Sequence, residues 1–176
     1  MRIHEAIEFA AVKHRGQVRK GTDIPYIVHP MEVMYILTQN DCDETTVIAG
    51  LLHDTIEDAG ATPEEIEAAF GKDVAQIVAA ESEDKSKSWQ ERKQATIDEL
   101  PGARFESQLV CCADKLSNMR SLIHDYAIVG EALWDRFKGT RAQTEWYYRS
   151  ILDALSVLED YPMYQQLKAC VEQMFG

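Results

Sequence analysis

Apolar residues recur with the three- and four-residue spacing of helices along most of this chain. No segment shows the period-two alternation of a half-buried strand, and no internal repeat or low-complexity linker is visible. The pattern predicts helices over residues 3–14, 30–39, 43–58, 62–70, 73–81, 89–99, 107–123, 131–137, 141–158 and from 162 onward. We therefore predict an all-α fold.

Polar residues mark where several of these helices begin. Asp43 is suited to cap the central helix, because its side chain can accept a backbone N–H of the first turn. Thr62, Pro63 and Glu65 combine a cap, a proline in the first turn and a glutamate three residues after the cap, which predicts a helix start. The segment 14–26 contains two glycines and a proline, and it is predicted to be a loop.

The central helix ends in an unusual concentration of titratable groups, in the sequence Leu51-Leu52-His53-Asp54-Thr55-Ile56-Glu57-Asp58. On a helix, His53 shares a face with Glu57, and Asp54 shares a face with Asp58. Charges at the end of a buried element are costly unless a cation or substrate compensates them. A metal site is one explanation, and a solvated acidic helix end with a stray histidine is the other.

The charge balance limits the partners. The chain has 176 residues and a net charge of −12, from 30 acidic and 18 basic residues. Nucleic-acid binding depends on basic patches, so DNA and long RNA are not expected as partners. A small anionic ligand requires a local cluster of cations or a metal that overrides the global field.

Apolar runs and cysteines indicate the compartment. No stretch approaches the roughly 18 to 20 uninterrupted apolar residues of a membrane span, and the N-terminus lacks the apolar region of a signal peptide. Cys42, Cys111, Cys112 and Cys170 show no Cys-x-x-Cys spacing and are predicted to be reduced residues of the core. We expect a cytoplasmic protein with no membrane partner. The sequence indicates no oligomeric state.

Two further residues can complete a site with His53 and Asp54. His29 lies at a loop-to-helix junction, and Asp114 is a charge within an apolar helix. Taken alone, His29 is better explained as a satisfied core histidine, and Asp114 as half of a surface pair with Lys115. Together the four supply two imidazoles and two carboxylates, which favour Mn²⁺ or Fe²⁺ over a structural zinc. On an octahedral ion they leave two positions open.

Five motifs in a fixed order then connect this site to a known family. They are His14-Arg15-Gly16-Gln17-x-Arg19-Lys20, Pro25-Tyr26-x-x-His29-Pro30, Leu51-Leu52-His53-Asp54-Thr55-x-Glu57-Asp58, Phe70-Gly71-x-x-Val74-Ala75 and Ala113-Asp114-Lys115-Leu116-x-Asn118-x-Arg120. With them the chain resembles the HD-domain metal-dependent phosphohydrolases, and within these the hydrolase domain of the RelA/SpoT alarmone enzymes and the free-standing small alarmone hydrolases. The resemblance implies one HD-type helical bundle over residues 1–176, with a motif-bearing core at 14–125 and a helical tail at 130–176.

The resemblance also implies roles for individual residues. The implied metal ligands, usually for Mn²⁺, are His29, His53, Asp54 and Asp114. Glu57 and Asp58 are the implied catalytic pair: Glu57 can orient or deprotonate water, and Asp58 can assist proton transfer to the leaving group. Arg19 and Lys20 line the implied nucleotide pocket, with Asn118 near the ribose. Arg19 is suited to bind phosphate or to stack on a base.

Other residues keep two interpretations. A charge run contains Lys85, Lys87, Arg92 and Lys93, which either meet a distal phosphate or form a solvated face. Tyr26 is interpreted as core packing rather than as part of the site. Arg120 is suited equally to phosphate contact and to a salt bridge. The segments 21–24 and 81–93 depart from the long bifunctional members of the family, which leaves guanine specificity open.

The predicted activity is Mn²⁺-dependent hydrolysis of the 3′-pyrophosphate of guanosine 3′,5′-bis(pyrophosphate) (ppGpp) or its pentaphosphate form (pppGpp), giving GDP or GTP and pyrophosphate. One alternative keeps the metal site and acts on another phosphorylated nucleotide or dinucleotide. A second alternative is a module that binds a nucleotide without turning it over.

Overall fold

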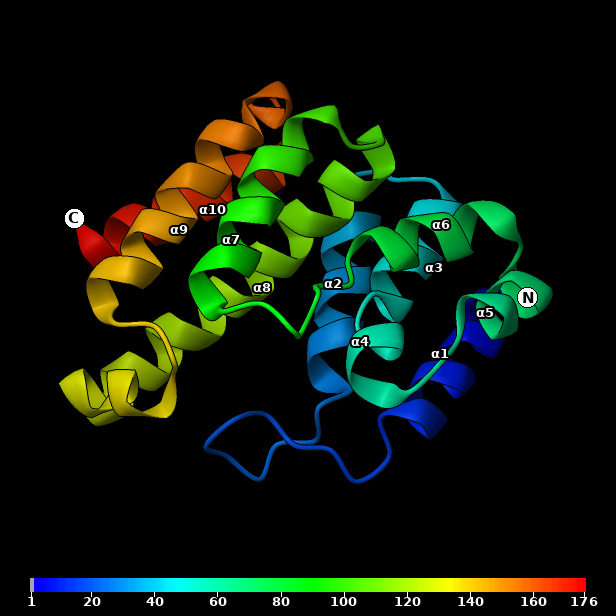
Figure 1. Ribbon diagram of the computed structural model, residues 1–176, viewed down its shortest axis with the longest axis horizontal. Helices are drawn as coiled ribbons and strands as arrows, with labels where there is room; N and C mark the ends of the chain where they lie inside the picture. Colours follow the sequence, from blue (N-terminus) through cyan, green and yellow to red (C-terminus); the bar gives the residue numbers. More distant parts are fainter. Residues whose placement is uncertain (1) are drawn as a thin grey trace. The chain divides into compact units, whose positions relative to one another are not determined.

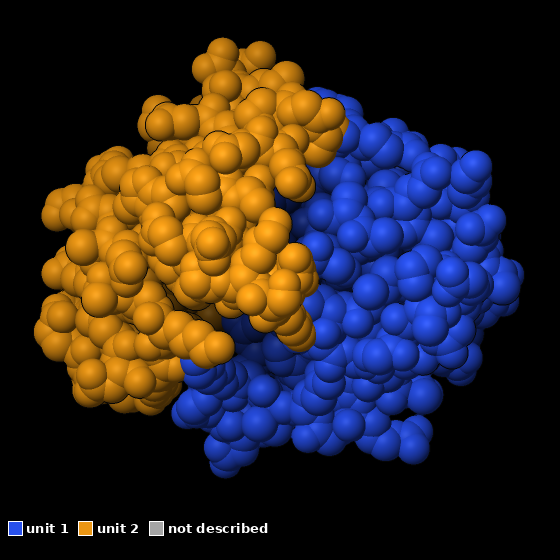
Figure 2. Space-filling view, in the orientation of Figure 1, with its two compact units in different colours: residues 1–82, 104–114 blue, residues 83–103, 115–176 orange. Residues whose placement is uncertain are grey.

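Helices account for nearly all regular structure in the computed structural model, which describes residues 2–176 (Figure 1). Among these residues, the only other regular feature is an isolated antiparallel bridge between Val18 and Pro25. The all-α prediction is confirmed. The helices divide into two compact units, coloured in Figure 2.

The first unit comprises residues 1–82 and 104–114. Its helices are α1 (Arg2–Lys13), α2 (Val28–Gln39), α3 (Glu44–Leu52), α4 (Thr55–Ala59), α5 (Pro63–Phe70), α6 (Lys72–Ala80) and the first part of α8 (Phe105–Val129). The short helix α3 is buried from Thr46 to Leu52, and it contacts α1, α2 and α6. An apolar helix of this kind is stabilised mainly by packing on all sides.

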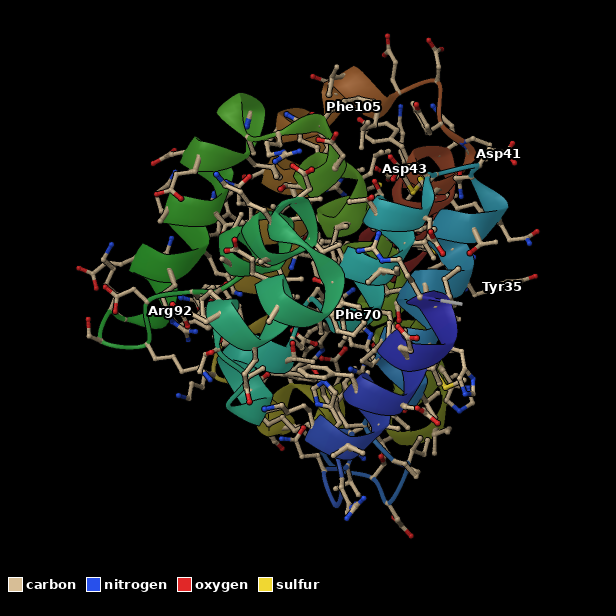
Figure 3. The ribbon with its side chains drawn as sticks, turned by 90° about the vertical axis from the view of Figure 1, so that its right-hand side faces the viewer. Tyr35, Asp41, Asp43, Phe70, Arg92 and Phe105 are labelled. Carbon is tan, nitrogen blue, oxygen red and sulfur yellow. The ribbon has the colours of Figure 1, made fainter. Side chains whose placement is uncertain are left out.

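Side chains define the helix ends of this unit as the sequence predicts. Asp43 stands at the start of α3 (Figure 3) and accepts a hydrogen bond from the Thr46 backbone N–H at 2.8 Å. Thr62 and Glu65 form a reciprocal capping box at the start of α5, with Pro63 in its first turn.

The second unit comprises residues 83–103 and 115–176. It contains α7 (Trp89–Glu99), the 3-10 helix η1 (Leu100–Gly102), the rest of α8, the 3-10 helices η2 (Gly130–Arg136) and η3 (Ser156–Leu158), α9 (Arg141–Ala154) and α10 (Pro162–Phe175). Helix α9 contacts both α7 and α10, and Figure 1 shows the three running side by side. The division of the chain into a core at 14–125 and a tail at 130–176 stays a prediction.

Three predicted helices are interrupted or of another type, and the helix expected over 107–123 extends to Val129 in α8. The helix expected over 43–58 breaks at His53-Asp54, where the His53 and Thr55 side chains bond the carbonyls of Gly50 and Leu52 at 2.8 and 2.7 Å. Side-chain bonds of this kind compete with the backbone bonds of a helix. The segment 131–137 forms a 3-10 helix, and the helix over 141–158 is interrupted at Leu155.

Two expectations about the surface and core can be compared with the described residues. None of their helices combines the length and apolar character needed to cross a bilayer. All four cysteines are free thiols; Cys111 and Cys112 are buried, whereas Cys42 and Cys170 are partly exposed. The prediction that the cysteines lie in the core is therefore confirmed for Cys111 and Cys112 and only partly met by Cys42 and Cys170.

Candidate metal centre

The four ligands predicted from the sequence come from three places in the first unit. His29 lies in the first turn of α2, where Pro30 follows it without losing a needed hydrogen bond. His53 and Asp54 occupy the break between α3 and α4, so both side chains leave the chain at a turn. Asp114 lies on α8, at the last position that this unit takes from that helix.

These four side chains converge. The Nε2 atom of His29 lies 3.1 Å from Oδ1 of Asp114 and 3.5 Å from Oδ2 of Asp54. The Nε2 atom of His53 lies 3.0 Å from the same Asp54 oxygen and 3.6 Å from the same Asp114 oxygen. The imidazoles and Asp114 are buried, and Asp54 is 18% exposed. The structure therefore brings all four predicted ligands together.

The hydrogen bonding of His53 determines which of its nitrogens faces the cluster. Nδ1 lies 2.8 Å from the Gly50 carbonyl, which can only accept, so Nδ1 carries the hydrogen. In the neutral ring the buried Nε2 then presents its lone pair to the cluster, and in the protonated ring it carries a hydrogen toward Oδ2 of Asp54. A lone pair beside two carboxylates requires a cation for compensation. The donor set, with its outer N–H held by a carbonyl, fits a first-row divalent ion.

The charges of the cluster shift its titration. Burial lowers the pKa of His29. Burial also acts to lower the pKa of His53, but Asp54 and Asp114 outweigh it and raise that pKa above its usual range. Burial alone would raise the pKa of Asp54, yet the two imidazoles lower it. Without an ion, positive charge is thus drawn into the cluster as a proton, which a metal would have to displace.

Tyr26 is a site residue that sequence reasoning missed. Its hydroxyl donates to Oδ2 of Asp54 at 2.6 Å, and its ring lies 5.8 Å from that of His29, between centroids. Burial and the Asp54 carboxylate raise the pKa of this phenol, so it remains a donor. Core packing was the favoured interpretation of Tyr26, and the hydroxyl contact shows that the side chain also touches the cluster. Its place in the Pro25-Tyr26-x-x-His29 motif was the available signal.

The predicted catalytic and substrate-binding residues of this unit lie close in sequence to the candidate ligands. Glu57 and Asp58 lie on α4, directly after the ligand pair; Glu57 is half-buried and Asp58 exposed. Arg19 is half-buried, with its guanidinium 5.7 Å from the centre of the Tyr26 ring, and Lys20 is exposed. The roles of these four residues stay predictions.

The remaining candidates belong to the second unit. Asn118 is half-buried on α8, and its role also stays a prediction. Arg120 donates to Oε1 of Gln166 at 2.6 Å. The phosphate contact and the salt bridge considered for Arg120 both stay predictions.

The charge run is not uniformly solvated. Lys85 and Lys87 are exposed. Arg92 and Lys93 each donate to Glu83 at 2.6 Å, and Lys93 also lies 4.9 Å from the centre of the Tyr147 ring. The second half of the run therefore stabilises its own unit.

Comparison with known proteins decides the family. The family model described as an HD domain matches residues 6–142. The chain belongs to the HD-domain family. This HD-domain protein is 35% identical, over 156 residues, to the Drosophila melanogaster guanosine-3′,5′-bis(diphosphate) 3′-pyrophosphohydrolase MESH1, covering 80% of this chain and 87% of that one.

Two solved structures are similar to this chain in both fold and sequence. A crystal structure from Listeria monocytogenes EGD-e matches with a TM-score of 0.78 and 34% identity, over 84% of this chain and 98% of that one. A metazoan ortholog of SpoT, described as hydrolysing ppGpp and acting in starvation responses, matches with a TM-score of 0.77 and 30% identity, over 99% and 93%. The family and the His-Asp cluster identify this HD-domain protein as a metal-dependent phosphohydrolase.

Proposed function

We propose that this protein hydrolyses the 3′-pyrophosphate of ppGpp to GDP and pyrophosphate, accepts pppGpp in the same way, and uses Mn²⁺. The convergence of His29, His53, Asp54 and Asp114 is the observation that carries the proposal. Further support comes from the relatives, two of which are described as acting on ppGpp. The carboxylate oxygens favour Mn²⁺ over a thiolate-preferring structural zinc.

His29, His53, Asp54 and Asp114 would hold the ion. When bound, it supplies Lewis acidity at a phosphoryl oxygen and makes water acidic enough to react near neutral pH. In the proposed reaction, water oxygen bonds to the phosphorus attached to the ribose 3′-oxygen, and the bond from that phosphorus to the 3′-oxygen breaks. The protein must take a proton from the water and allow one to reach the 3′-oxygen.

We assign those proton transfers to α4. Glu57, half-buried and four residues after His53, orients the attacking water and accepts its proton. Asp58 assists delivery of a proton to the leaving 3′-oxygen. Arg19 and Lys20 neutralise phosphate oxygens, Arg19 through its planar fork and Lys20 as a point charge. Asn118 contacts the ribose.

The test uses purified protein stripped with a chelator and reloaded with Mn²⁺. Incubation with ppGpp is expected to yield GDP and pyrophosphate in equal amounts, measured by ion-exchange chromatography and mass. His53→Ala removes a buried ligand and should abolish turnover, whereas His124→Ala, an exposed histidine on α8, is the matched control. Turnover that survives His53→Ala, or none in the loaded wild type, contradicts the proposal.

A nucleotide panel separates the alternatives. Departures at 21–24 and 81–93 motivate a second candidate, hydrolysis of another phosphorylated nucleotide or dinucleotide. Products from 2′- or 3′-phosphate esters, with none from ppGpp, would favour that candidate. Tight binding of unchanged ppGpp after long incubation would favour a binding module. Repeating the panel with Mg²⁺, Co²⁺ and Zn²⁺ tests the choice of metal.

A further inference from the structure

The loop that carries Arg19 and Lys20 is a small hairpin, residues 17–26. At its base, the Tyr26 backbone N–H donates to the Gln17 carbonyl at 2.9 Å. The Val18–Pro25 bridge follows, and the Arg19 N–H donates to the Ile24 carbonyl at 2.8 Å. Backbone pairing thus holds the base of the hairpin in one arrangement.

Both residues at the hairpin base extend their side chains to α4. Tyr26 donates its hydroxyl to Oδ2 of Asp54 at 2.6 Å, and Gln17 donates its amide N–H to the Asp58 carbonyl at 2.7 Å. Asp54 and Asp58 lie one helical turn apart and are joined by their own backbone hydrogen bond of 2.9 Å. The hairpin therefore holds α4 near both ends. It bonds the side chain of Asp54, a candidate metal ligand, before the helix, and the backbone carbonyl of Asp58, a member of the proposed catalytic pair, toward its end.

His14 fixes the orientation of Gln17. The Gln17 amide nitrogen is committed to the Asp58 carbonyl, so its oxygen faces the ring of His14, where Nδ1 lies 2.7 Å away and must donate. His14 is only 3% exposed, and its ring centroid lies 5.0 Å from that of Tyr26. Because His14 holds the Gln17 amide oxygen, the Gln17 side chain loses little further conformational freedom when its amide N–H bonds α4.

We propose that Gln17 and Tyr26 are positioning residues: Tyr26 holds the Asp54 carboxylate in its ligating orientation, and Gln17 holds the Glu57-Asp58 turn against the reacting groups. Neither acts on substrate directly. The same hairpin carries Arg19 and Lys20, so phosphate binding and metal chemistry share one scaffold. This inference rests on the proposed function for the part that concerns turnover. Partners of metal ligands generally alter affinity or activity by about 10- to 100-fold.

The Tyr26 half is tested by metal affinity without substrate. Tyr26→Phe keeps the ring and removes only the hydroxyl, and it should weaken Mn²⁺ binding by about 10-fold or more in calorimetric titration. Tyr126→Phe is the matched control, because it removes an equivalent 2.6 Å bond from a tyrosine hydroxyl to the carboxylate of Glu131 in the second unit. We expect the control to bind Mn²⁺ as the wild type does.

The Gln17 half is tested by turnover and by local opening. Gln17→Met keeps the length of the side chain and removes its donor; it should lower kcat about 10-fold, leave KM within about twofold, and leave Mn²⁺ affinity unchanged. It should also raise hydrogen exchange at the α4 amides. Gln165→Met, which removes a 2.6 Å bond to the Glu159 carbonyl in the second unit, should change none of these.

Each half has its own refutation. Wild-type Mn²⁺ affinity in Tyr26→Phe overturns the assignment of Tyr26. Unchanged α4 exchange in Gln17→Met, or wild-type kcat wherever the wild type turns over a nucleotide, overturns that of Gln17. If the wild type fails to hydrolyse ppGpp, the proposed function falls, yet metal affinity and exchange still decide this inference.

Discussion

Gly50 lies where α3 packs closely against α2, and Gly50→Ala should disturb the metal centre through this contact. A methyl group added there would lie 2.2 Å from Cδ1 of Leu37 and 3.2 Å from Cγ1 of Val33, both fully buried on α2. The same α2 carries His29, and the Gly50 carbonyl accepts the Nδ1–H of His53. Forcing the helices apart therefore moves the two imidazoles relative to each other.

The magnitude follows from the contact. Carbon atoms pack at about 3.5–4.0 Å, so the methyl requires Leu37 or α3 to move by about 1.5 Å. Overpacking of a filled core costs about 1–3 kcal/mol, and replacing a mid-helix glycine by alanine returns about 1 kcal/mol. We expect a net loss of up to about 2 kcal/mol, which corresponds to a fall of up to about 4–8 °C in Tm for a chain of this size. Mn²⁺ affinity should fall by about 10-fold or more.

The assays are thermal unfolding of the metal-free protein and calorimetric titration with Mn²⁺. Gly102→Ala is the matched control, because a methyl group there meets nothing within 4 Å. A second test adds Leu37→Ala, which removes the clashing atom; in the Gly50→Ala background its cost should be smaller than in the wild type by about 1 kcal/mol. If Gly50→Ala unfolds and binds Mn²⁺ like Gly102→Ala, or if the two costs simply add, the packing argument is refuted.

The remaining predictions concern stability. Glu83→Gln leaves two half-buried cations without their carboxylate and should cost about 2–3 kcal/mol in urea unfolding, against less than about 1 for exposed Glu172→Gln. Burial alone would raise the pKa of Glu83, but Lys93 and its neighbours lower it. This contribution is therefore complete above the unfolded-state pKa of about 4.3 and is lost as pH falls through the lower folded value. The Tm values of the wild type and of Glu83→Gln should therefore converge as the pH falls below about 4.3. Asp43→Ala removes the cap on the Thr46 N–H and should cost about 1 kcal/mol by the same assay. Mn²⁺ at about 100 times its Kd should add about 2.7 kcal/mol, a shift that a chelator reverses and that His53→Ala abolishes.

The helical fold could be predicted from local patterns, and the candidate ligand set from such patterns together with the family resemblance. Asp43 and Thr62 cap helices through bonds to residues three positions away, so spacing alone identifies them. The convergence of His29, His53-Asp54 and Asp114 was predicted from unusual polar residues at the ends or within apolar segments. Buried charges need compensation wherever the chain brings them together, and that requirement holds before any tertiary structure is known.

The break at His53-Asp54 and the contacts of Tyr26 depend on competition that spacing cannot decide. Helical periodicity continues through 43–58, yet the helix breaks at His53-Asp54, where two side chains bond the carbonyls of Gly50 and Leu52. Tyr26 is amphipathic, so core packing and a buried hydroxyl bond are equally compatible with its sequence position. Its hydroxyl reaches Asp54 because Gln17 and Tyr26 pair at the hairpin base, and that pairing places the ring beside His14 and His29. The interruption of the helix and the hairpin that holds it thus belong to one arrangement: because α4 is too short to fix its own orientation, contacts from outside the helix must supply it.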